Sequence, residues 1–224
     1  MSDTDSFIEE VTEEVRRDRL FAWMKRYGWI AVCAVLIVVG GAAFNEYRKA
    51  KLTAQTQAFG DAILSALEND EPAARVAALA SAKASGAGAQ SLLGLLTSKE
   101  QIEAGDLDGA KQTLKAVSDD SEAPIIYRQV ASFKLLSLQA EDLDLTERQA
   151  GYEALIGGNP NLQILAEEQL VLILIEQGNT EEAIAALSRI VQTEQASGGL
   201  RRRASQLIVA LGGTVPDVTD TPGE

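Results

Sequence analysis

The sequence has no histidine, and Cys33 is its single cysteine. Without histidine, this chain cannot form a Ser-His-Asp triad, a Cys-His pair or a histidine-ligated metal site. A single cysteine excludes an intramolecular disulfide and a cysteine-built zinc or iron–sulfur site. Because Cys33 lies within an apolar run, we also expect no thiolate chemistry in water. These absences exclude most of the common catalytic and metal-binding constellations.

Motifs for nucleotide binding and catalysis are missing as well. The glycine pairs Gly157-Gly158 and Gly198-Gly199 lack the lysine and the strand context of a phosphate-binding loop. Adjacent carboxylates such as Glu167 and Glu168 lie on a predicted helix, where consecutive side chains point apart. We therefore predict that the protein is not an enzyme and that it has no cofactor, no bound metal and no small-molecule substrate.

The chain has few basic residues relative to acidic ones. It carries 33 Asp and Glu against 20 Lys and Arg, and its net charge at pH 7 is −13. Such a surface repels phosphates, which argues against nucleic acid as a partner. Proteins remain as the expected partners.

A long apolar run, GWIAVCAVLIVVGGAAF, occupies residues 28–44 and contains no charged side chain. With its flanking residues it reaches about 21 residues, or roughly 30 Å as a helix, which matches the hydrocarbon core of a bilayer. Aromatic residues stand at both ends, as they do at membrane interfaces. We predict a single transmembrane helix over residues 28–45; a buried helix of a soluble protein is the alternative.

Basic residues are distributed unevenly around this run. The head, residues 1–27, is predicted to begin as an amphipathic helix. It carries five basic residues close to the run, and three basic residues follow the run: Arg16, Arg17, Arg19, Lys25 and Arg26 before, and Arg48, Lys49 and Lys51 after. The positive-inside rule therefore predicts a cytoplasmic head and an exported body. A cleaved signal peptide is the alternative, because Gly40 and Ala42 are small residues at suitable spacing.

The body, residues 46–211, has a helical composition rich in Ala, Leu, Gln and Glu, and no run in it indicates a strand. We predict an all-α fold in which the transmembrane helix continues outward into the body. The helices are expected at about 46–69, 73–85, 88–104, 107–118, 124–140, 146–156, 161–177, 180–195 and 199–211. The tail, residues 212–224, is rich in Gly, Pro, Thr and Asp and is predicted to be disordered.

Two segments of the body align without a gap, 73 residues apart, or about two periods of 36 residues. The first contains Gly105, Ala110 and Leu114, and the second contains Gly178, Ala183 and Leu187. In each, glycine ends one helix in a left-handed cap, and a small alanine follows where two helices approach closely. This pattern resembles the tetratricopeptide repeat, which stacks helix–turn–helix units of about 34 residues. The resemblance implies a solenoid of about four helical hairpins ending in a cap helix, residues 199–211. An irregular helical bundle is the alternative.

The order of head, span and repeats is similar to that of the bacterial inner-membrane tetratricopeptide proteins typified by the ancillary subunit of the Sec translocon. This resemblance implies a single-pass inner-membrane protein with a periplasmic body. It also implies association with the SecYEG channel, a membrane-anchored periplasmic chaperone and exported clients. An envelope-assembly or cell-division scaffold, a non-catalytic subunit of a membrane enzyme and an anchor acting through its head are the alternatives.

A stacked array of this kind presents one surface lined mainly by the first helix of each hairpin. Aligning the copies places five polar residues toward it. We predict that they bind an extended segment or a partner helix: Lys99, Glu103, Gln129, Ser132 and Glu168.

Overall fold

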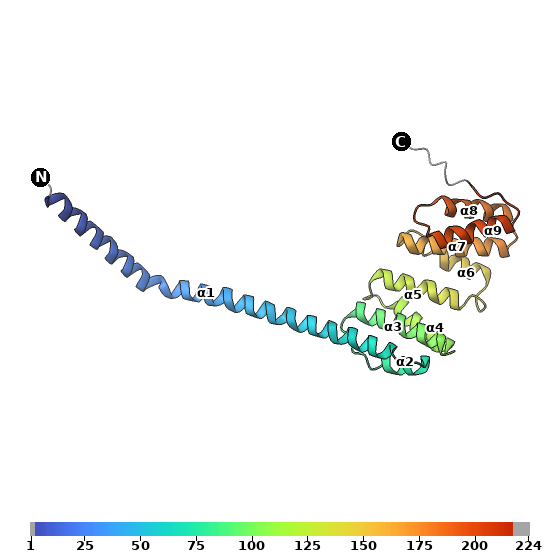
Figure 1. Ribbon diagram of the computed structural model, residues 1–224, viewed down its shortest axis with the longest axis horizontal. Helices are drawn as coiled ribbons and strands as arrows, with labels where there is room; N and C mark the ends of the chain where they lie inside the picture. The colour runs from blue at the N-terminus through green and yellow to red at the C-terminus, as the bar shows by residue number, and fades with distance from the viewer. Residues whose placement is uncertain (1–2, 217–224) are drawn as a thin grey trace. The chain divides into compact units, whose positions relative to one another are not determined.

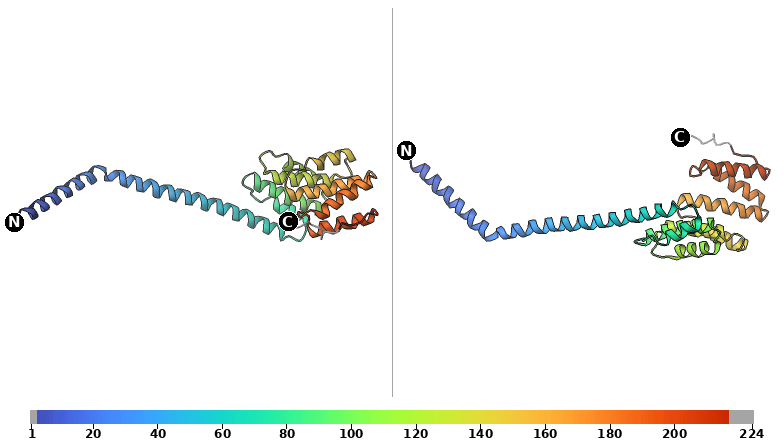
Figure 2. Two further views of the ribbon diagram at one scale, coloured as in Figure 1. Left: turned by 90° about the horizontal axis from the view of Figure 1, so that it is seen from above. Right: turned by 60° about the horizontal axis from the view of Figure 1, so that its bottom comes forward.

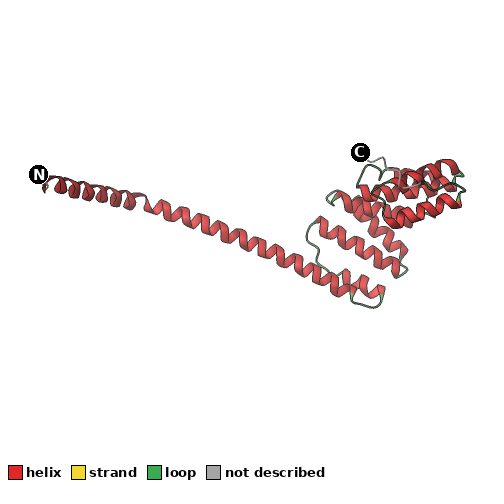
Figure 3. Ribbon diagram, turned by 45° about the horizontal axis from the view of Figure 1, so that its top comes forward, coloured by secondary structure: helices red, strands yellow, loops and turns green. Residues whose placement is uncertain are grey.

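A computed structural model describes residues 3–216, which divide between two units, Met1–Ala58 and Phe59–Glu224. Side chains are described from Trp23 onward, with the exceptions of Gly28, Ala31 and Val32. Within this range every regular element is an α-helix (Figure 3). The predicted all-α class is therefore confirmed for the part of the chain that the structure describes.

Helix α1 runs without interruption from Asp3 to Leu67 (Figure 1). The helix of the apolar run therefore continues without a break into the predicted body as far as Leu67, whereas the predicted membrane span and its direction stay predictions. Residues 59–67, the last two turns of α1, belong to the second unit, where Ala66 is buried.

The second unit continues with shorter helices, each joined to the next by a short loop (Figure 1). Their bounds are α2 Pro72–Leu79, α3 Ala87–Glu103, α4 Leu107–Asp119, α5 Ile125–Leu138, α6 Leu145–Glu153, α7 Pro160–Glu176, α8 Thr180–Gln192 and α9 Gly198–Ala210. Helix α2 ends at Leu79, six residues earlier than predicted. There the Ser81 hydroxyl donates to the Ala78 carbonyl, which satisfies one of the last acceptors of the helix.

Helices α3 to α8 form three hairpins: α3 with α4, α5 with α6, and α7 with α8. Each second helix also packs against the first helix of the next hairpin, and α9 packs on α8 in this way (Figure 2). The first helices α3, α5 and α7 also contact one another in succession, whereas no extensive contact joins the second helices α4, α6 and α8. The fourth predicted hairpin, at about 46–85, covers the end of α1 and the short α2, but no extensive contact joins these two helices, and α2 packs on α3 instead.

Two helix–helix turns have the same geometry. Gly105 and Gly178 both adopt φ +80°, a conformation that is unfavourable for residues with a Cβ. After Gly105, the Asp106 amide donates to the Gln101 carbonyl at 2.8 Å; after Gly178, the Asn179 amide donates to the Leu174 carbonyl at 2.9 Å. These bonds, together with those from the glycine amides, form two Schellman motifs. The turn chemistry expected from the sequence is therefore present in both copies.

The middle hairpin turns by a different device, because its loop, residues 139–144, has no glycine. Asp144 caps α6, its side chain accepting from the Glu147 amide at 2.8 Å. Glu147 in turn accepts from the Asp144 amide, which completes a capping box. Helix α6 is short, and Arg148 ties it to α7 through two hydrogen bonds to the Glu176 carboxylate at 2.8 and 3.0 Å.

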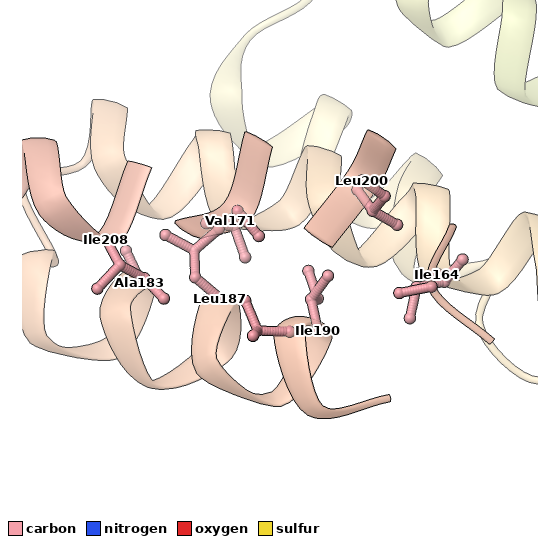
Figure 4. Close-up of a cluster of buried hydrophobic side chains, with 10 residues drawn as sticks. Ile164, Val171, Ala183, Leu187, Ile190, Leu200 and Ile208 are labelled. Atoms are coloured by element: carbon pink, nitrogen blue, oxygen red, sulfur yellow. The ribbon is translucent and has the colours of Figure 1, made fainter. Parts of the chain in front are cut away.

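The largest hydrophobic cluster lies between α7, α8 and α9. The buried side chains of these helices converge, as Figure 4 shows for Val171, Leu187, Ile190 and Ile208. Ala110, Leu114, Ala183 and Leu187, the four apolar residues of the repeat signature, are fully buried. Smaller clusters around Tyr152 and Leu114 continue the core through the earlier hairpins.

The C-terminal end of α9 is closed by Gly212, which has φ +82°, and by Gly213, whose amide donates to the Ile208 carbonyl at 2.9 Å. Residues 217–224 of the predicted tail lie outside the described residues.

Candidate functional site

Lys99 and Glu103, two of the predicted binding residues, belong to an ion-pair network at the start of the second unit. Arg75 of α2 donates to Glu100 and, at 2.7 Å, to Glu103, while Lys99 contacts both carboxylates at 3.0 and 2.6 Å. Arg75 also donates to the backbone carbonyls of Asn69 and Asp70, in the loop that follows α1. The network joins this loop, α2 and α3, and it already occupies the charges of Lys99 and Glu103.

Glu100 is the centre of the network, with a side chain only 2% exposed. Burial favours its neutral form, but hydrogen bonds from Arg75 and Lys99 outweigh this effect and hold the pKa of Glu100 below its usual range. Glu100 is therefore a structural carboxylate, ionised in the folded protein. The helical period had not distinguished it from the exposed Glu103, three residues later.

Gln129 and Ser132 lie on a different face. They line a cavity of about 410 Å³ between α5 and α6, together with Leu136 and Leu155. The Ser132 hydroxyl donates to the Arg128 carbonyl of its own helix at 2.9 Å. Both residues are half-buried and lie beside an apolar wall.

Glu168 of α7 is nearly buried and forms an ion pair with α9. Arg203 of α9 donates to its two carboxylate oxygens through Nε and Nη2, both at 2.9 Å. Glu168 is the largest cause of the raised pKa of Arg203. This pair spans 35 residues of sequence, and no local pattern marks it.

The five predicted residues thus contact three separate sets of helices: α2 and α3, α5 and α6, and α7 and α9. The structure does not gather them into one cluster. Three of them already have partners of opposite charge within the chain. Their role in partner binding stays a prediction.

A groove between α6 and α8, which the sequence reasoning missed, has a volume of about 520 Å³. Its floor is α7, and its lining includes Ile156, Leu170, Leu174 and Ala186. One signal in the sequence could have indicated it. Ile156 comes just before Gly157-Gly158, and two glycines have no side chains that could cover a bulky apolar residue at a helix end.

The apolar run of α1 shows large side chains exposed in every direction. Val35, Leu36, Ile37, Val38 and Val39 are 59–74% exposed, and five consecutive helical residues span the whole circumference. Among the residues whose side chains the structure describes, no helical stretch is long and apolar enough to cross a membrane. Gly28, Ala31 and Val32 of the predicted span lie outside those residues.

The topology residues fall in the head. Arg16, Arg17 and Arg19 lie outside the residues whose side chains are described, whereas Lys25 and Arg26 are exposed. The Arg26 guanidinium lies 6.0 Å from the centre of the Tyr27 ring, and the Trp23 ring contacts the same ring at a tilt of 52°, with centroids 5.4 Å apart.

A family model described as a tetratricopeptide repeat-like domain matches residues 22–155, more than half of the chain. The chain belongs to this family. The match includes the apolar run of α1, helices α2 to α6 and the glycine turn at Gly105. No curated protein and no solved structure matches the chain. Domains of the tetratricopeptide repeat-like family typically serve as scaffolds for protein–protein interaction rather than as catalysts.

Proposed function

We propose that this tetratricopeptide repeat-like protein is a membrane-anchored, non-enzymatic scaffold that holds protein partners beside the bacterial inner membrane. The circumferential exposure of Val35–Val39 is the observation that carries the proposal. A soluble helix buries at least one face, whereas a helix exposing large apolar side chains all round has a lipid-like environment as its natural solvent. The family match supports the scaffold part of the proposal, because tetratricopeptide repeat-like domains typically bind protein partners.

The proposed orientation places the head in the cytoplasm and the repeat body in the periplasm. Five Lys and Arg precede the run closely and three follow it, which favours this direction of insertion. Aromatic side chains are exposed at both ends of the run, as membrane interfaces favour: Trp23, Tyr27 and Trp29 at its start, and Phe44 and Tyr47 at its end.

The proposed partners are the SecYEG channel, a membrane-anchored periplasmic chaperone and the exported clients passed between them. This assignment rests on the resemblance of the head, span and repeats to the ancillary translocon subunit. The repeat body contributes stacked hairpins with surfaces suited to binding proteins.

Cysteine labelling tests the topology, because the chain has a single cysteine to remove. In a Cys33→Ser background, we would place one cysteine at Thr12 in the head or at Ser121 in the exposed loop between α4 and α5. A membrane-impermeant maleimide applied to cells with permeabilised outer membranes should label Ser121→Cys and leave Thr12→Cys unlabelled until the inner membrane is lysed. Equal labelling of both before lysis would refute the proposed orientation.

In-cell crosslinking followed by purification of the full-length protein in mild detergent tests the partners. Recovery of the channel together with a periplasmic chaperone supports the translocon assignment. Recovery of division or envelope-synthesis proteins without the channel refutes that assignment and leaves an anchored scaffold for another assembly. Recovery of a membrane enzyme as the main stoichiometric partner identifies a non-catalytic enzyme subunit instead.

A further inference from the structure

The groove between α6 and α8 arises from how the hairpins stack. The first helices follow one another in contact, but no extensive contact joins the second helices α6 and α8. Helix α7 is therefore covered on the flanks where α6 and α8 pack and is left open between them. The open strip is lined over two turns, from Glu167 to Leu174.

The middle of this groove is apolar, and three charged side chains lie around it: Glu153 of α6, Glu167 at the start of the α7 strip and Arg189 of α8. Leu170 and Leu174 come from α7, Ala186 from α8, and Ile156, 39% exposed, follows α6. Ile156, Leu170 and Leu174 therefore bring three large aliphatic side chains together along one strip of the surface. The exposed Ile156 marks one end of the strip as accessible to a partner.

The charged side chains that line the groove form no ion pair with any residue whose side chain the structure describes, as is also true of other surface charges of this unit such as Lys134 and Arg202. Glu153 and Glu167 accept hydrogen bonds only from neutral amides, those of Gln149 and Gln163, at 2.8 and 2.9 Å. Arg189, on the opposite edge, forms no ion pair with any described residue. Arg75, Arg148 and Arg203, by contrast, each hold a carboxylate of this chain. The edge is acidic overall, in a chain of net charge −13.

The dimensions fit a helix. Two helices that flank a third, each about 8–10 Å from it, leave between them the groove that a fourth helix would fill in ordinary ridge-and-groove packing. A strip two turns long contacts apolar residues at positions i, i+3 or i+4, and i+7 of such a helix. Charge complementarity selects a helix whose polar edges carry Lys and Arg toward Glu153 and Glu167.

We propose that the groove of α6, α7 and α8 is the docking site for a basic amphipathic helix of a partner protein. The inference rests on the proposed function only in that the protein is a scaffold for protein partners. It does not depend on which partner is bound or on the membrane anchor, so failure of the translocon assignment leaves it standing.

Two synthetic peptides of about 18 residues, or five helical turns, provide the probe. They share one leucine stripe and differ in their polar positions, which are Lys-rich in one and Glu-rich in the other. Binding to the full-length protein in mild detergent is measured by fluorescence anisotropy. We expect the Lys-rich peptide to bind at least about tenfold more tightly than the Glu-rich one.

Matched variants separate groove binding from general attraction to an acidic protein. Ala186→Phe fills the groove, whereas Ala185→Phe makes the same change at an exposed position one residue away. Likewise, Glu153→Lys changes the groove edge, and Glu141→Lys makes the same change in an exposed loop. Ala186→Phe and Glu153→Lys should each raise the Kd for the Lys-rich peptide by about tenfold or more. The two control variants should raise this Kd by much less.

Equal effects of each variant and its control, with unchanged helical content, would overturn the proposal. It would also be overturned if light scattering showed a dimer that Ala186→Phe dissociates and Ala185→Phe does not, because the occupant would then be a second copy. Tight peptide binding together with loss of SecYEG from the crosslinked complex would refute only the translocon assignment.

Discussion

At the scale of single residues, the second unit is stabilised by glycines in left-handed turns and by buried charged groups. At Gly178 the left-handed φ of +80° ends α7 and lets the chain enter α8. An L-residue in this conformation brings its Cβ close to the following carbonyl oxygen. We therefore expect Gly178→Ala to lower the free energy of unfolding by about 1 kcal/mol. Urea denaturation of the full-length protein in detergent, followed by circular dichroism, measures the effect.

The control for this prediction is Gly198→Ala at the start of α9. Gly198 has no left-handed φ, and a Cβ added there would meet nothing within 4 Å. Its replacement should be neutral or slightly stabilising, because alanine has less freedom to lose on folding. Equal destabilisation by both variants would contradict the assigned role of the Gly178 turn.

Glu100 provides a pH-dependent contribution to stability. Its pKa is held below the usual range, so its stabilisation is fully present above the pKa of the unfolded carboxyl, about 4.3, and is lost as the pH falls through the lower folded value. We expect Glu100→Gln to lower the free energy of unfolding by on the order of 2 kcal/mol at neutral pH. The difference in the free energy of unfolding between native protein and variant should become smaller as the pH falls below about 4.

Urea titrations of native protein and variant between neutral and acidic pH check this expectation. Glu141→Gln, in an exposed loop, is the matched control and should change stability by less than about 0.5 kcal/mol. A difference between native protein and Glu100→Gln that stays constant through acidic pH would show that the Glu100 carboxylate is not the titrating group.

Helices approach one another closely where small residues allow it. At Gly94 of α3, an added Cβ would lie 2.5 Å from the Val117 side chain of α4. Gly94→Ala gains about 1 kcal/mol of helix propensity but overpacks this interface, which costs about 1–3 kcal/mol. We expect net destabilisation, partly relieved in the double variant Gly94→Ala/Val117→Ala.

The double-mutant cycle isolates this contact. A favourable coupling of about 1 kcal/mol between the two changes, measured by urea denaturation, would confirm that α3 and α4 meet at Gly94 and Val117. Additive effects would indicate that the interface relaxes around the new methyl group. Gly60→Ala, where an added Cβ meets nothing within 4 Å, controls for helix propensity alone.

The elements that could be predicted from the sequence are those whose signal is local. Gly105 and Gly178 predict their turns correctly, because a left-handed helix cap depends only on the residues next to it in the sequence. The early end of α2 and the Glu168–Arg203 pair depend on distant or weak interactions, which helical periodicity does not encode. The groove of α6 and α8 was missed because it arises from which helices fail to touch, a property of stacking rather than of any segment.

At the scale of the whole molecule, the proposed function depends on the apolar run of α1. If lipid covers Val35–Val39, a charge near the middle of the run should weaken insertion. Lys at a helix centre costs roughly 2.5–3.5 kcal/mol in insertion experiments. We expect the double variant Ile37→Lys/Val38→Lys to move the protein largely from the membrane fraction to the soluble fraction, as measured by flotation of cell membranes.

The matched control, Ile37→Leu/Val38→Leu, keeps the run apolar and should float with the membranes. Thermal unfolding of the second unit, monitored by the near-ultraviolet signal of the buried Tyr152, should be the same for both variants, because neither position lies within that unit. Loss of membrane association in both variants would point to a specific protein receptor for this helix, which reads side-chain shape. Retention by both would place the attachment elsewhere in the chain. Only loss with lysine and retention with leucine fits a helix solvated by lipid, because lipid responds to charge and not to the branching of an aliphatic side chain.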